Sequence, residues 1–119
     1  MLSDTATFQK IYLACGYTDL RSGIDRLSTL VKKQFDLDPF QKDVLFLFCG
    51  RRKDRFKGLL WCGDGFLLLY KRIECGYVQW PRDSSEMAEL SPQELRDLLG
   101  GFQILQKSSI KEATCTESA

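Results

Sequence analysis

The chain contains no histidine, and this absence removes several classes of chemistry at once. A Ser-His-Asp triad, a Cys-His pair, a histidine general base and a His-ligated metal site all need an imidazole. The five cysteines are Cys15, Cys49, Cys62, Cys75 and Cys115, and no two are closer than thirteen residues. The C-x-x-C spacing of zinc and redox sites is therefore missing. We expect reduced thiols, most of them packed as small hydrophobic side chains, and no disulfide that folding requires.

Long hydrophobic runs are also missing. The longest, residues 44–49 and 66–70, have the length of strands, far below the ~18 residues of a membrane span. The first residues, MLSDTATFQK, contain an acid and lack the apolar core of a secretory signal. We expect a cytoplasmic protein with no membrane partner. A chain of 119 residues, 44% of them hydrophobic, suits one globular domain, which we place at residues 1–107, followed by a flexible tail over residues 108–119.

Charge is unevenly distributed behind a formal net charge of +1. Residues 1–50 carry six basic and six acidic side chains, residues 51–82 carry eight and three, and residues 83–119 carry three and seven. A local excess of one sign attracts partners of the opposite sign. The middle third is therefore a candidate contact for a polyanion, and the last third is not.

Apolar runs and turn residues predict a single α+β domain with the element order β-α-β-β-β-β-α. A short strand over residues 10–15 comes first. The run at residues 44–49 is continuously apolar, so both of its faces should be covered. Short turns separate four such runs, which predicts a four-stranded antiparallel meander made of residues 44–49, 56–62, 66–73 and 77–80.

Two helices are predicted around this meander. Apolar residues at three- and four-residue steps indicate an amphipathic helix over residues 20–35 that packs against the sheet. Thr18 or Asp19 can cap it, and Gly23 would lie inside it. A short C-terminal helix begins at residues 91–94 (SPQE), which have the pattern of a capping box with proline at the first helical position.

The turn between the first two meander strands is rich in cations. Four lie within five positions, and three more follow on the next strands: Arg51, Arg52, Lys53 and Arg55, then Lys57, Lys71 and Arg72. Aromatic residues are interleaved with them, namely Phe56, Trp61, Phe66, Tyr70, Tyr77 and Trp80. Cations that pair with phosphates, beside rings that stack on bases, are what a nucleic-acid surface needs. The alternative is a solvated hairpin tip above aromatic residues that belong to the core.

Five acidic residues could in principle gather as metal ligands for phosphoryl transfer: Asp19, Asp25, Asp54, Asp64 and Glu74. Their contexts favour other roles, because Asp64 lies in a Gly-Asp-Gly turn and Asp54 among four cations, where a local ion pair is expected. We therefore expect no catalytic site, metal or cofactor. Cys75 is the best candidate for a reactive thiol, since it follows two cations near a turn, although packing or plain exposure is the simpler explanation.

Residues 11–25 read IYLACGYTDLRSGID, and they resemble the opening motif of the TnpB accessory proteins of insertion-sequence-66-type transposons. These proteins are unrelated to the RNA-guided nucleases that share the name TnpB. The downstream helix that begins LSPQELRDLL is also similar to the family. Further matches follow in order at residues 38–40, 45–48, 50–55, 57, 60–61, 63–66, 70–72, 74, 76 and 80–81.

The resemblance implies a role in transposition, beside a separate and larger DDE-type transposase, and no catalytic site in this chain. Two residues depart from the family pattern. Cys62 stands where an aspartate usually follows the tryptophan, and Ser22 stands where lysine is frequent. Both changes remove a charge, so the first weakens any role for an acid there and the second thins the basic surface.

Two functions are open at this point. The first is a non-catalytic accessory protein that contacts the backbone of transposon DNA through the seven cations named above. The second is an adaptor that binds the element's transposase or its other accessory protein, through the acidic segment around residues 84–94. Neither function requires a small-molecule substrate.

Overall fold

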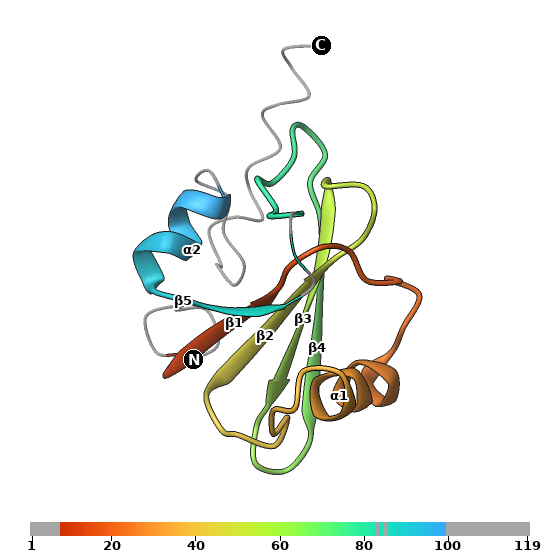
Figure 1. Ribbon diagram of the computed structural model, residues 1–119, viewed down its shortest axis with the longest axis vertical. Helices are drawn as coiled ribbons and strands as arrows, with labels where there is room; N and C mark the ends of the chain where they lie inside the picture. Colours follow the sequence, from red (N-terminus) through yellow and green to blue (C-terminus); the bar gives the residue numbers. More distant parts are fainter. Residues whose placement is uncertain (1–7, 83, 85, 100–119) are drawn as a thin grey trace.

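The chain forms one mixed β-sheet with a helix packed against each face (Figure 1). The structure is a computed structural model, and it describes residues 8–82, 84 and 86–99. The predicted tail over residues 108–119 lies outside these ranges. The elements in chain order are β1 (Lys10–Ala14), α1 (Ile24–Lys33), β2 (Val44–Cys49), β3 (Arg55–Trp61), β4 (Phe66–Arg72), β5 (Met87–Leu90) and α2 (Pro92–Leu99). Neither helix in these ranges combines the length and hydrophobicity that crossing a membrane requires.

The strand order in the sheet is β4-β3-β2-β1-β5. Strands β2, β3 and β4 form an antiparallel meander, while β1 runs parallel to β2 and antiparallel to β5. The parallel pair needs a crossover, and the segment that contains α1 provides it. All six residues of β2 are buried, which confirms that both faces of this strand are covered.

The predicted fourth meander strand is wrong. Residues 77–80 belong to no strand and do not pair with β4, and they pack on one face of the sheet instead. Val78 and Trp80 are buried in the core on that face, and the Trp80 indole N–H donates to the Ala14 carbonyl at 2.8 Å. Tyr77 and Gln79 are exposed. This alternation imitates a strand, because a chain lying flat on an apolar surface also buries every second side chain.

Strand β5 lies in the acidic segment around residues 84–94, where the sequence pattern predicts no strand. Its four residues pair with β1, with Ile11 opposite Leu90 and Ala14 opposite Met87. The strand is short, and three of its four residues are only partly buried. The hydrophobic pattern of these four residues is therefore too weak to predict a strand. Hydrogen bonding to β1 stabilises β5 instead.

Helix α1 is shorter than predicted. It begins at Ile24, and Gly23 is its N-cap without a side-chain capping bond, so neither Thr18 nor Asp19 caps it. Asp19 instead accepts bonds from the backbone N–H and the guanidinium of Arg21. Residues 16–23 thus form a loop beside the sheet, and this loop becomes a wall of the site described below.

The capping box of α2 is confirmed. The Glu94 N–H donates to the Ser91 hydroxyl at 3.1 Å, and the Ser91 N–H donates to the Glu94 carboxylate at 2.8 Å. Leu95 and Leu98 of this helix pack on the sheet face that carries Val78 and Trp80. The opposite face is covered by Leu27 and Val31 of α1, so the sheet separates two apolar cores.

Replacing Trp80 with phenylalanine tests the role of residues 77–80 as a covering segment. The ring stays in the core, but the donor to the Ala14 carbonyl is lost. We expect the free energy of unfolding, measured by urea titration, to fall by about 1–3 kcal/mol. The control is Tyr77→Phe at an exposed position, where the change should stay below about 0.5 kcal/mol. Equal, near-zero changes in both variants would contradict this packing.

Candidate nucleic-acid interface

A groove of about 930 Å³ opens where β2 turns into β3. The loop that follows β1 forms one wall, the turn that follows β2 closes one end, and side chains of β3 and β4 line the floor. Its ionisable and aromatic lining consists of five cations, two tyrosines and one carboxylate: Arg21, Arg51, Arg52, Arg55, Lys57, Tyr17, Tyr70 and Asp19. Four of the seven predicted cations therefore share one concave surface with Tyr70, one of the interleaved aromatic residues. Tyr17 and Arg21 join them from the loop, and the sequence pattern does not predict either of them there.

Strand register explains the floor of the groove. In the β3–β4 pair, Lys57 lies opposite Tyr70 and Arg55 lies opposite Arg72. Residues two apart on a strand project to the same face, so these four side chains share one face. Leu59, next along β3 on this face, packs in the core beneath α1. The polar residues thus continue this face beyond the part that the helix covers.

Three of the seven predicted cations, Lys53, Lys71 and Arg72, lie outside the groove lining. Arg72 shares the face of Arg55 but lies beyond the lined part. Lys71 is opposite Phe56, which is buried in the core on the other face, so Lys71 projects away from Arg72 and Lys57. Burial lowers the pKa of its ammonium group. Lys53 lies in the turn itself, where its backbone carbonyl accepts the Val78 N–H at 2.8 Å. Because side chains alternate between the two faces of a strand, Lys71 and Arg72 point in opposite directions although they are adjacent in the sequence.

The loop wall is joined to the basic turn by side-chain contacts. The Arg51 guanidinium lies 4.4 Å from the centre of the Tyr17 ring and donates to its hydroxyl at 2.9 Å. The Leu20 side chain packs against Gly50, where an added Cβ would lie 3.1 Å from Leu20 Cγ. Glycine at position 50 thus permits the close approach of loop and turn.

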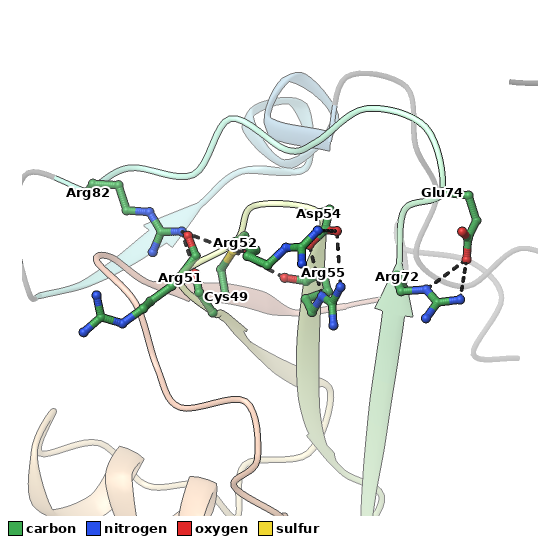
Figure 2. Close-up of polar contacts among 9 residues, drawn as sticks. Cys49, Arg51, Arg52, Asp54, Arg55, Arg72, Glu74 and Arg82 are labelled. Carbon is green, nitrogen blue, oxygen red and sulfur yellow. Dashed lines mark hydrogen bonds and ion pairs between the residues drawn. The ribbon is translucent and has the colours of Figure 1, made fainter. Parts of the chain in front are cut away.

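Carboxylates hold several of the arginines in place (Figure 2). Asp54 lies 3.3 Å from Arg52 and 3.0 Å from Arg55, which confirms the expected local ion pair. The bond from Arg55 lowers the pKa of the Asp54 carboxyl. Arg72 pairs with Glu74 at 2.8 Å. Exposed pairs of this kind add little stability, but they orient the guanidinium groups and neutralise part of their charge.

A second carboxylate lies on the loop wall. Asp19 is bound by Arg21, whose side-chain bonds lower the pKa of the Asp19 carboxyl to about 2. Asp19 therefore stays ionised at neutral pH and offsets one of the five groove cations. Within the described residues, no three His, Cys, Asp or Glu side chains gather as metal ligands would.

Arg82 connects the two sides of the groove and has no signal in the sequence. Figure 2 shows its guanidinium pointing into the turn that follows β2. It donates to the carbonyls of Gly50 and Arg51 on the turn, and to the carbonyl of Gly16 on the loop wall. These contacts span more than thirty residues of sequence in each case, so local patterns could not reveal them.

The described cysteines differ in their surroundings: Cys49 is packed in the core, whereas Cys62 and Cys75 are exposed. Cys49 is buried under the turn, where its thiol contacts the carbonyls of Arg52 and Arg55. Burial raises the pKa of this thiol to about 11, which makes it a poor nucleophile at neutral pH. Cys115 lies outside the described residues.

Comparison with known proteins identifies the family. A family model described as "IS66 Orf2 like protein" matches residues 9–109, and the chain belongs to this family. Two relatives come from Sinorhizobium fredii (strain NBRC 101917 / NGR234). The uncharacterized protein y4hO is 33% identical over 93 residues, covering 78% of this chain and 80% of its own. The uncharacterized protein y4jC is 32% identical, covering 78% of this chain and 79% of its own. No solved structure matches the chain.

Replacing Arg82 with alanine should loosen the groove without unfolding the sheet. The carbonyls of Gly16, Gly50 and Arg51 lose a shared charged donor, and we expect a loss of about 1–3 kcal/mol in the free energy of unfolding. The amide proton of Thr18, which is bonded to the Cys49 carbonyl, should exchange faster in hydrogen-exchange measurements.

The conservative variant Arg82→Lys serves as the control for charge. An ammonium group lacks the planar fork of donors, so lysine should restore only part of the protection. Full protection of Thr18 in the alanine variant would show that Arg82 does not hold the loop against the turn.

Proposed function

We propose that this protein is a cytoplasmic, non-catalytic accessory protein in the transposition of its insertion sequence, and that it contacts the backbone of the element's DNA. The observation that carries the proposal is the gathering of five cations from the loop after β1, the turn after β2 and strand β3 on one groove. Membership of the IS66 Orf2-like family supports the link to transposition.

The basic turn, residues 51–55, is the primary contact in this proposal. Arg51 and Arg52 are exposed at the tip between β2 and β3, so they reach phosphates without burying charge. Arg55 and Lys57 continue the positive surface along the floor. Asp54 holds Arg52 and Arg55 in place, and a phosphate binds at the sides of those guanidinium groups that the carboxylate leaves exposed.

Replacing Arg51, Arg52, Lys53 and Arg55 together with alanine tests this contact. If all four contact duplex phosphates, they contribute roughly −3.6 to the slope of log affinity against log salt, at about −0.9 per phosphate. We expect the variant to lose most of its affinity for duplex DNA and to show a flatter salt dependence in fluorescence anisotropy. The loss should be similar for unrelated duplex sequences, because backbone contacts do not read bases.

A matched control removes four exposed cations elsewhere, at Lys10, Arg26, Lys33 and Lys42. It has the same net charge as the quadruple turn variant, so a difference between the two measures position and not overall charge. Circular dichroism checks that both remain folded. Equal DNA affinity in the two folded variants would remove the turn from the interface.

An adaptor role is the second candidate, and the acidic edge of the sheet favours it. Strand β5 is an edge strand, and Glu86 and Glu89 are exposed on and beside it. Glu94 is already engaged in the capping box of α2. A basic surface on the element's transposase is the partner that this edge would suit. If the quadruple turn variant keeps its DNA affinity, this second function becomes the leading one.

The absence of catalysis is a separate expectation. Asp54 is paired with arginines and Asp64 lies exposed in a turn, so neither is placed to share a metal ion with other acids. We expect the purified protein to leave supercoiled plasmid intact with magnesium or manganese, in a gel assay of nicking and joining. Nicking that disappears in Asp54→Ala or Asp64→Ala would overturn this expectation.

A further inference from the structure

We infer that the groove takes a segment of single-stranded DNA, with unpaired bases against Tyr17 and Tyr70 and phosphates on the surrounding arginines. This inference rests on the proposed function, because it assumes that DNA is the ligand. The inference adds two statements to the proposed function: the groove binds single-stranded DNA, and the two tyrosines select that form. The basic turn alone would hold any phosphate backbone, so the tyrosines carry the new claim.

The two tyrosines are unusual for their exposure. Tyr17 is 56% exposed and Tyr70 is 54% exposed, and among the described residues only Phe40 and Tyr77 are large hydrophobic side chains exposed to a similar degree. Two of these four residues therefore lie in one groove, on opposite elements: Tyr17 on the loop wall and Tyr70 on the floor. Neither is needed to fill a core, so their rings are available to a ligand.

Cations hold both rings in position. Arg51 lies over Tyr17 at 4.4 Å, and the Lys57 ammonium lies 5.8 Å from the centre of the Tyr70 ring. The Lys57 ammonium also donates to the Ser22 carbonyl at 3.0 Å, which ties the floor to the loop. A base that stacks on such a ring places its own phosphate close to the neighbouring cation. Alternating rings and cations are the pattern by which proteins bind single strands.

The shape of the site favours a single strand over a duplex. The groove is open to solvent, and its volume of about 930 Å³ is comparable to that of ligand sites, roughly 300–1,000 Å³. Unpaired bases can enter the groove. The bases of a duplex are stacked in the interior of the double helix, so a duplex would bring only its phosphates to the rim of the groove. In the described part of the chain, β4 is the edge of the sheet, and no further strand covers the groove on the side of Tyr70.

The experiment compares three labelled probes by fluorescence anisotropy at one salt concentration. They are an oligothymidylate of about twelve nucleotides, an abasic strand of equal length, and a blunt duplex of equal length. The wild-type protein should bind the oligothymidylate more tightly than the abasic strand. Tyr70→Ala should weaken oligothymidylate binding roughly 5- to 150-fold, as expected for one lost stacking contact, and should leave abasic and duplex binding unchanged.

Two variants make the result specific to the ring. Tyr70→Phe keeps the stacking surface and should retain oligothymidylate affinity. Tyr77→Ala removes an equally exposed tyrosine that does not line the groove, and it should have no effect. Tyr17→Ala should act in the same direction as Tyr70→Ala, and it also releases Arg51 from its contact with the ring.

Failure of this inference differs from failure of the proposed function. If the duplex binds through the turn but the oligothymidylate and abasic strand bind equally, or Tyr70→Ala changes nothing, the groove is a backbone site only and the inference is wrong. If no DNA probe binds, the proposed function fails as well. Labelled polyglutamate, measured under the same conditions, is a fourth probe that tests for anionic peptide. If it binds as tightly as the oligothymidylate, the inference is also overturned.

Discussion

The contact of Arg82 with three backbone carbonyls is the interaction on which the arrangement of the groove depends. Two loops leave the same end of the sheet, after β1 and after β2, and together they line the groove. The Arg82 guanidinium binds the carbonyls of both loops and thus satisfies polar groups that have no strand partner. One partly buried guanidinium group therefore holds the loop after β1 and the basic turn together.

Residues whose role is set by local chemistry were predictable from the sequence. Ser91 and Glu94 form a capping box because both partners lie within one helical turn. The three strands of the meander follow from short apolar runs that are separated by glycine-rich or charged turns. The failures involve distant partners. Trp80 alternates like a strand residue yet donates to Ala14 across the core, and β5 exists only because β1 offers an edge.

The same distinction applies to the site. The sequence indicated Arg51, Arg52, Arg55 and Lys57 because charge is visible without a structure. It could not indicate that Tyr17 shares their groove, since Tyr17 and Arg51 are 34 residues apart. Successive side chains of a strand point to opposite faces, so Lys71 and its neighbour Arg72 lie on different faces of the sheet. A count of charges along the sequence does not distinguish the two faces. Composition thus located the polyanion surface, and topology decides which side chains belong to it.

The position of β1 between β2 and the edge strand β5 has a consequence for the order of folding. Strands β2, β3 and β4 are joined by short turns, so their pairing closes only small loops, whereas pairing of Ile11 with Leu90 closes nearly the whole described chain. Closing a longer loop costs more entropy, and contacts between distant residues form more slowly. During synthesis the meander can assemble while β1 still has an open edge. The segment that carries Arg82 comes immediately before β5 in the chain, so the bonds that Arg82 makes to the loop and to the turn form late, close to the pairing of the last strand.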